Sequence, residues 1–223
     1  MNERMKFYRI VSRSLMLKLF AMSVLFFASN LTVQASFIDT PVDTTTAWAG
    51  THWVIKPLKN SDSAEYYTTY QSSAKYLYEA LGWGWPTRKI TPAVNADMVR
   101  HHVSQHEAQL SFTYVIRAKD ANSIAGAIYV NPVNPERRHI PNFTAGNYAA
   151  EVTFWFTEEA ETSAQVDTLL KEVFQWIENE WALSSVLIPV NKNYAFIQQQ
   201  MAQLEYKAFS EDSDSGELLY RLP

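Results

Sequence analysis

Residues 151–206 read EVTFWFTEEAETSAQVDTLLKEVFQWIENEWALSSVLIPVNKNYAFIQQQMAQLEY and decide the fold. Apolar side chains recur at every second position in 151–157, which is the period of a strand with two distinct faces. In 164–183 they recur every three or four residues, which predicts a long amphipathic helix. SVLIPV at 185–190 reads as a strand, and a further helix follows within 191–206. A strand, a helix and a strand in this order make a crossover onto one sheet, so we expect a mixed α/β sheet with helices on both faces.

The start of the long helix carries a candidate ligand site. Thr162 and Gln165 have the spacing of a capping box, which would leave free backbone N–H groups at the carboxyl end of the preceding strand. The positive end of a helix dipole attracts anions, phosphate above all. The sequence therefore predicts an anion site where the strand at 151–157 meets the helix.

The rest of the chain supplies neighbours for this unit. Its hydrophobic periods predict, in order, a strand at 51–58, a helix from a capping box of Asp62 and Glu65 to Gly82, a helix at 95–110, strands at 111–118 and 123–130, and a final hairpin of 206–209 with 217–222. The two middle strands are joined by a turn of hairpin length, so they should pair with each other. Pro189 lacks an amide hydrogen, and incomplete pairing of its strand would open a cleft beside it.

The longest segment without a regular pattern inside the domain is 131–148. It holds three prolines, and a loop of this length is commonly functional or mobile. Arg137, Arg138 and His139 could guide an anionic cofactor, since arginine forms forked contacts with phosphate. An ordinary solvated loop is the alternative.

The first 35 residues are expected to lie outside the folded domain. Five basic residues precede an apolar run at 19–28, and Val33 and Ala35 occupy the small-residue positions of a cleavage site. This pattern is typical of a secretory signal peptide, so we expect an exported protein, periplasmic or extracellular. An uncleaved membrane anchor is the alternative, since loosely apolar character extends from Leu15 to Val33. Residues 36–50 then read as a linker and residues 51–223 as one domain.

Composition limits the classes of function. A hydrophobic content of 47% and a charged content of 19% suit a globular core. Loss of residues 1–35, which hold five basic residues and one acidic residue, would change the net charge from −4 to −8, and such a surface argues against nucleic-acid binding. The absence of cysteine excludes disulfides and cysteine nucleophiles. His102 and His106 stand four apart on a predicted helix, but no third ligand accompanies them, so no metal is expected.

The order of elements resembles the acetyl-CoA-dependent N-acetyltransferase superfamily known as GNAT, over about residues 51–223. THWVIKPL at 51–58 is similar to the first strand of that family, and DANSIAGAIYV at 120–130 is similar to its second hairpin strand, where an I-x-G element is common. EVTFWFT at 151–157 resembles the central strand whose backbone receives the pantetheine arm. The resemblance implies a GNAT-like mixed, mostly antiparallel sheet and acyl transfer from acetyl-CoA, as co-substrate, to a primary amine.

The same resemblance implies a set of cofactor-binding residues. They are the wall residues Phe154, Trp155 and Phe156, the rim residues Ala164, Gln165 and Val166, and Asn193, which sits where many members carry an Asn that faces the cofactor.

Two family motifs are altered. The pyrophosphate loop of the family reads Arg/Gln-x-x-Gly-x-Gly/Ala, whereas this chain has ETSAQV at 161–166, without either glycine and with an acid at the basic position. Many members carry a Tyr general acid in the last helix, but Gln200 or Met201 stands near that position here. These departures favour an alternative function, a catalytically silent GNAT-fold domain that binds a ligand or a partner in the cell envelope.

If the chain is an enzyme, Glu151 is the predicted general base. Acyl transfer needs a deprotonated amine, and a carboxylate on the central strand can accept the proton through water. The alternative is a solvent-exposed carboxylate at a strand end. The acceptor would be a small-molecule or peptide amine, and membrane contact would be made only through an uncleaved N-terminal segment.

Overall fold

The computed structural model describes residues 38, 43–87, 89–138, 140–181 and 183–223. The predicted signal peptide at 1–35 lies outside these residues. Within them, no helix is both long enough and apolar enough to cross a bilayer.

The sheet has eight strands in the order β1-β2-β3-β4-β5-β6-β8-β7. Their bounds are Trp48–Ala49 (β1), Trp53–Pro57 (β2), Phe112–Ala118 (β3), Ile124–Asn131 (β4), Ala150–Phe156 (β5), Val186–Asn191 (β6), Ser210–Asp212 (β7) and Glu217–Leu222 (β8). Every neighbouring pair is antiparallel except β5 with β6, which is parallel. The predicted mixed, mostly antiparallel sheet is therefore confirmed.

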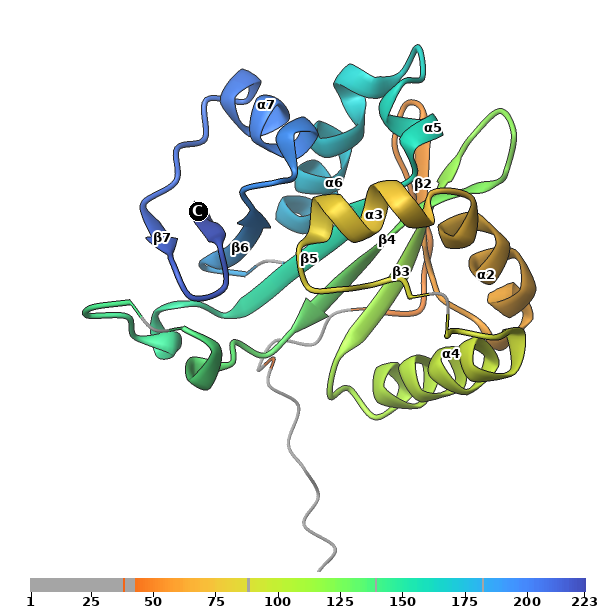
Figure 1. The fold of residues 1–223 in the computed structure, drawn as a ribbon, viewed down its shortest axis with the longest axis horizontal. Helices are drawn as coiled ribbons and strands as arrows, with labels where there is room; N and C mark the ends of the chain where they lie inside the picture. Colours follow the sequence, from red (N-terminus) through yellow and green to blue (C-terminus); the bar gives the residue numbers. More distant parts are fainter. Residues whose placement is uncertain (1–37, 39–42, 88, 139, 182) are drawn as a thin grey trace, which may run out of the picture. The chain divides into compact units, whose positions relative to one another are not determined.

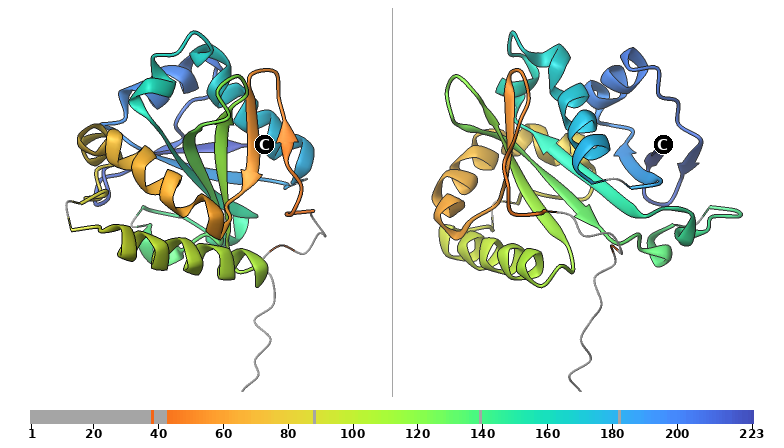
Figure 2. Two further views of the ribbon diagram at one scale, coloured as in Figure 1. Left: turned by 90° about the vertical axis from the view of Figure 1, so that its right-hand side faces the viewer. Right: turned by 180° about the vertical axis from the view of Figure 1, so that it is seen from behind.

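Helices cover both faces of this sheet (Figures 1 and 2). Their bounds are Ser63–Ser72 (α2), Ala74–Leu81 (α3), Pro92–Glu107 (α4), Glu158–Glu161 (α5), Val166–Glu180 (α6) and Ala195–Gln203 (α7). Three short 3-10 turns, Asn60–Asp62 (η1), Pro135–Arg137 (η2) and Ala145–Asn147 (η3), complete the described elements. Helices α2, α3 and α4 lie on one face and α6 lies on the other, as Figure 2 shows.

The face under α6 is closed by aromatic side chains. Tyr114 of β3 packs edge-on against Trp176 and Trp181, with ring centroids 4.7 and 5.9 Å apart. Both tryptophans are buried and belong to the apolar stripe of α6 and its C-terminal end. Such edge-on pairs add about 0.5–1.5 kcal/mol each to the burial of the rings. The 3.6-residue period read from the sequence is the period that turns these residues toward the sheet.

The opposite face is organised around Trp155 of β5. Its ring lies 5.6 Å from the ring of Tyr66 in α2 and 5.6 Å from that of Trp85. The indole Nε1 donates to the hydroxyl of Tyr129, which lies 2.5 Å from the hydroxyl of Tyr66. The polar atom of the indole is thus satisfied inside the core.

Three predicted boundaries are wrong. The helix predicted from Asp62 to Gly82 breaks at Ser73, where the backbone leaves the helical region. The first strand of the final hairpin is Ser210–Asp212 rather than 206–209. The segment 36–50, predicted as a linker, contains β1, which pairs with β2. In each case the boundary depends on pairing or packing with residues distant in the chain. The hydrophobic periodicity of the sequence carries no information about those contacts.

Gly82 ends α3, as predicted, and its replacement by alanine should destabilise the protein. Its φ is +73°, and an added Cβ would lie 2.2 Å from the Asn191 side chain at the end of β6. The left-handed conformation alone costs an L-residue about 1–2 kcal/mol, so we expect at least that loss in urea denaturation of Gly82→Ala. Gly146→Ala is the matched control, because nothing lies within 4 Å of its added Cβ. Equal effects of the two substitutions would contradict this role for Gly82.

Candidate functional site

The two parallel strands of the sheet part soon after they meet. Both β5 and β6 are described in full, and they pair at two positions only, Ala150 with Val186 and Glu151 with Leu187. Beyond these positions the edge of β5 has no strand beside it, while β6 continues its ladder with β8. We call this divergence the strand split. A backbone edge left without a strand must find other partners.

One such partner is the side chain of Tyr194, which stands before α7. Its hydroxyl accepts a hydrogen bond from Phe156 N at 3.2 Å and donates to Glu161 Oε1 at 2.6 Å. Tyr194 is buried. A residue that follows β6 therefore reaches across the strand split and occupies the last N–H of β5.

Glu161 also accepts a hydrogen bond on its other carboxylate oxygen, Oε2, from the hydroxyl of Tyr76 in α3. The rings of Tyr76 and Tyr194 meet edge-on, with centroids 6.2 Å apart. Burial raises the pKa of the Glu161 carboxyl to about 7, against the opposing effect of the two tyrosine hydrogen bonds. Burial and the nearby carboxylate also raise the pKa of both tyrosines. We call Tyr76, Glu161 and Tyr194 the tyrosine–carboxylate cluster.

Helix α3 spans the ends of both diverging strands. At its start, Ser73 Oγ accepts a hydrogen bond from Glu158 N of α5, which follows β5. At its end, Gly82 packs directly on Asn191, the last residue of β6. Figure 1 shows α3 in front of β5 and running toward β6. The helix thus lies over the open end of the strand split, with Tyr76 directed into the cluster.

The predicted anion site at the start of the long helix is built differently from the expectation. Residues Glu158–Glu161 form the short helix α5, and Thr162 ends it by donating its hydroxyl to the carbonyl of Glu158. The N-cap residue of α6 is Gln165, and its side chain makes no capping bond. The capping box of Thr162 and Gln165 is therefore wrong, because an acidic turn stands between β5 and α6.

The residues predicted to bind the cofactor lie in three places. Phe154 and Phe156 are buried with their rings stacked 5.4 Å apart, while Trp155 faces the aromatic core under α2. In the rim, Ala164 is exposed, and Gln165 and Val166 are partly exposed at the start of α6. Asn193 is exposed in the turn before α7, where its N–H donates to Asn191 Oδ1.

Glu151, the predicted general base, is buried rather than exposed. Arg138 Nη2 lies 2.9 Å from Glu151 Oε2, although without hydrogen-bond geometry. Arg138 Nη1 donates to Glu217 of β8. Burial lowers the pKa of the guanidinium, but the two carboxylates raise it by more, so the net shift is upward. Arg138, predicted either to guide an anion or to be solvated, instead anchors the loop to the sheet.

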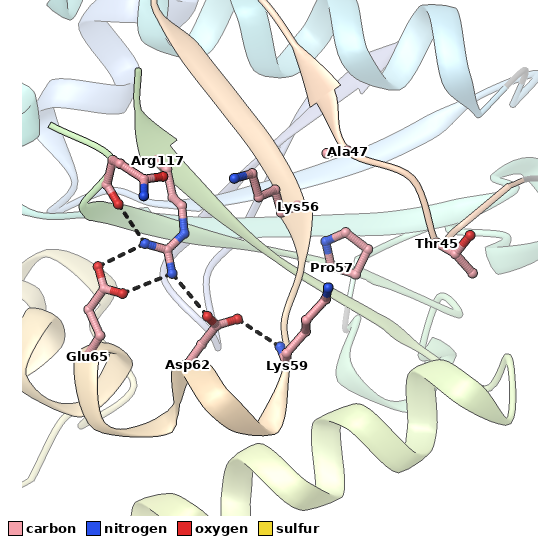
Figure 3. Close-up of a pocket in the computed structure, with 9 residues that line it drawn as sticks. Thr45, Ala47, Lys56, Pro57, Lys59, Asp62, Glu65 and Arg117 are labelled. Carbon is pink, nitrogen blue, oxygen red and sulfur yellow. Dashed lines mark hydrogen bonds and ion pairs between the residues drawn. The ribbon is translucent and has the colours of Figure 1, made fainter. Parts of the chain in front are cut away.

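A separate pocket of about 400 Å³ opens beside β2 and α2 (Figure 3). Its charged centre is Arg117 of β3, which binds Asp62 Oδ1 at 3.0 Å and both oxygens of Glu65 at 2.9 Å. The predicted capping box of Asp62 and Glu65 is wrong, because both carboxylates hold this arginine and Asp62 caps η1 through Lys59 N. Because Arg117 Nη1 also donates to Asn122 O at 2.7 Å, Arg117 serves as a structural clamp between α2 and the β3–β4 hairpin.

The two predicted metal-spaced histidines serve the fold. His106 is buried, and its ring nitrogens lie 3.2 Å from Thr113 O and 3.0 Å from Thr44 O. His102 lies 3.3 Å from the hydroxyl of Thr113. Burial lowers the pKa of both imidazoles. No group of three potential metal ligands occurs among the described residues.

The fold matches solved acetyltransferase structures. The ribosomal-protein-S5-alanine acetyltransferase of Vibrio fischeri aligns with 79% of this chain and 96% of its own, at 14% identity and a TM-score of 0.59. RimL, a ribosomal L7/L12 α-N-protein acetyltransferase in complex with coenzyme A, aligns with 79% of this chain and 97% of its own, at 12% identity and a TM-score of 0.60. The microcin C7 self-immunity acetyltransferase MccE, in complex with acetyl-CoA and AMP, aligns with 84% and 98%, at 9% identity and a TM-score of 0.58.

These likenesses establish the GNAT acetyltransferase fold, which the resemblance of the sequence implied. No protein-family model and no curated protein matches the sequence.

Sequence reasoning missed the tyrosine–carboxylate cluster. Its members come from α3, α5 and the turn before α7, far apart in the chain. One signal was available. The predicted helix from Asp62 to Gly82 included Tyr76 without assigning it a role, and Glu161 was interpreted as part of an altered pyrophosphate loop.

Proposed function

We propose that the protein transfers an acyl group from an acyl-CoA to a primary amine. The observation that carries the proposal is the strand split, which leaves the edge of β5 without a strand partner beyond Glu151. A flexible amide-bearing chain such as pantetheine can hydrogen-bond to such an edge as an added strand does. The coenzyme A and acetyl-CoA complexes of two structural neighbours agree with this choice of donor.

In the proposed reaction, the lone pair of the amine attacks the thioester carbonyl carbon. The C–N bond forms, the C–S bond breaks and CoA leaves as a thiolate, while the proton lost by the amine is accepted by a general base, which then passes it to the thiolate or to solvent. Glu151 remains the proposed proton acceptor, because it is the last residue of β5 paired with β6 and so stands at the apex of the strand split. The proposed acceptor is a small-molecule or peptide amine.

The donor would fit the two ends of the split unequally. The free edge of β5 suits the chain-like part of an acyl-CoA. At the far end, Tyr194 already occupies Phe156 N, and helix α5 carries Glu158, Glu159 and Glu161, whose negative charges oppose a pyrophosphate. No ion pair of the described residues involves any of these three glutamates. Before the donor binds at this end, the Tyr194 hydroxyl therefore has to leave Phe156 N, and the negative charge of α5 has to be reduced.

Acetyl-CoA at about 1 mM should raise the melting temperature of the protein, because a ligand selective for the native state stabilises it.

Replacement of the proposed base, Glu151→Gln, should lower kcat/KM for amine acetylation by about 10²–10⁴-fold. Glu217→Gln is the matched control, because it removes the other carboxylate of Arg138 and leaves the strand split unchanged. If none of several acyl-CoAs raises the melting temperature, the proposal that an acyl-CoA is the donor is wrong. Full activity in Glu151→Gln removes Glu151 from the mechanism.

We also propose that the chain is exported, on the pattern of residues 1–35. N-terminal sequencing of the mature protein tests this, and an intact Met1 would contradict cleavage of the segment.

A further inference from the structure

The tyrosine–carboxylate cluster joins four elements at one point. Glu161 belongs to α5, Tyr76 to α3 and Tyr194 to the turn before α7, and the Tyr194 hydroxyl holds Phe156 N of β5. These bonds lie across the open end of the strand split. Any ligand that uses the last N–H of β5 must first displace the Tyr194 hydroxyl.

When Glu161 is ionised, the cluster is negatively charged and repels the proposed donor, because an acyl-CoA is an anion. The titratable groups that face its carboxyl are Tyr76 of α3, Tyr194 before α7 and Glu158 of its own helix. None of them is a cation. An anionic ligand that enters here meets a half-buried carboxylate, and the interaction of two like charges is stronger where water is excluded.

We propose that Tyr76, Glu161 and Tyr194 form a latch that controls entry of the acyl donor, and that the donor binds only when Glu161 carries a proton. This inference rests on the proposed function. A neutral carboxyl can accept from one tyrosine and donate to the other. The charge-assisted hydrogen bond that holds Tyr194 is then replaced by a weaker neutral one, so the Tyr194 hydroxyl leaves Phe156 N more readily. Protonation of Glu161 also removes one of the three negative charges of α5. Binding of the donor is therefore coupled to the uptake of one proton.

The direction of the pH effect follows from the raised pKa of Glu161. An acid whose pKa is higher in the folded protein than in the unfolded chain stabilises the fold below the unfolded value. That contribution is lost as the pH rises through about 7. The same proton is required by the donor, so affinity for acetyl-CoA should be constant below about pH 7 and fall about tenfold per pH unit above it.

Acetyl-CoA binding by calorimetry between pH 5.5 and 8.5, without an acceptor amine, tests the latch. Glu161→Gln keeps a neutral side chain of the same shape between the tyrosines, so its affinity should lack the tenfold fall per pH unit above about pH 7 and exceed that of the unmodified protein at pH 8.5. Glu159→Gln is the matched control, because Glu159 is exposed on the same short helix and carries the same charge. It should follow the pH profile of the unmodified protein. Ligand phosphates titrate in the same range, and the comparison between variants cancels their contribution.

The outcomes separate the latch from the proposed function. Binding that is independent of pH in the unmodified protein, or an identical pH profile in Glu161→Gln, overturns the latch and leaves acyl transfer standing. Loss of pH dependence in Glu159→Gln as well assigns the effect to general charge and also overturns the latch. Failure of every variant to bind at every pH overturns the proposed function, and the control of donor entry falls with it.

A second measurement reports on the cluster without a ligand. The melting temperature of the unmodified protein, relative to that of Glu161→Gln, should decrease as the pH rises from 5 to 8.5. A difference that does not change with pH shows that Glu161 does not titrate in this range and overturns the latch.

Discussion

Arg138→Met should lower the free energy of unfolding by about 3–5 kcal/mol, because it leaves two buried carboxylates without their shared cation. The Arg138 side chain is 0% exposed and lies between Glu151 of β5 and Glu217 of β8. Methionine fills much of the same volume, so the loss would report the charge rather than a cavity. Equilibrium denaturation in urea, followed by tryptophan fluorescence, measures it.

The neighbouring Arg137 supplies the matched control. Its side chain is 53% exposed, and its Nη2 lies 3.9 Å from Glu217. An exposed ion pair of this kind contributes little, so Arg137→Met should change the free energy of unfolding by less than about 1 kcal/mol. If the two substitutions cost the same, Arg138 does not anchor the loop in the way described.

Trp155→Ala is expected to cost about 3–5 kcal/mol of stability, the range for removal of a large buried aromatic side chain. Trp155 is 1% exposed and packs against Tyr66 and Trp85. The substitution also removes the indole donor to Tyr129 and leaves that hydroxyl with one partner fewer inside the core. The urea midpoint should fall accordingly, with the slope unchanged.

Trp83→Ala controls for the loss of an indole as such. Trp83 is 61% exposed and stacks on Trp85 at 5.6 Å, outside the core. We expect a change of about 1 kcal/mol or less. A large effect at Trp83 with a small effect at Trp155 would contradict the packing described for this face of the sheet.

Trp155 was also predicted to line the wall of the cofactor site. Loss of acetyl-CoA affinity in a folded Trp155→Phe variant would still support that role.

The sequence predicted those features that depend on local period and on chain order. The alternation in EVTFWFT gave β5, and the apolar stripe of 164–183 gave α6, because burial on one face imposes a repeat of two or of 3.6 residues. The end of α3 at Gly82 followed from the same local chemistry. The order of these elements resembled that of the GNAT superfamily, and the resemblance implied the fold that the solved structures match.

The candidate site was predicted only in part. Glu151 was placed correctly on the central strand, but its partner Arg138 was assigned to solvent or to an anionic ligand. The two capping boxes were wrong, because the acids and hydroxyls that match that motif serve other partners in the fold. A spacing of three residues specifies a capping box only when no stronger partner competes for the side chain.

The sequence by itself predicted most strands of the sheet, the long helix α6 and the crossover that joins β5 to β6, but it placed β1 in a linker and ran α2 and α3 together. Only the tertiary structure decided that α3 lies over the strand split, that Tyr194 takes the last N–H of β5, and that Glu161 is buried between two tyrosines. The reason is physical. Periodicity records which residues avoid water, whereas hydrogen bonds between buried polar groups depend on which distant segments meet, and the pKa of Glu161 depends on that meeting.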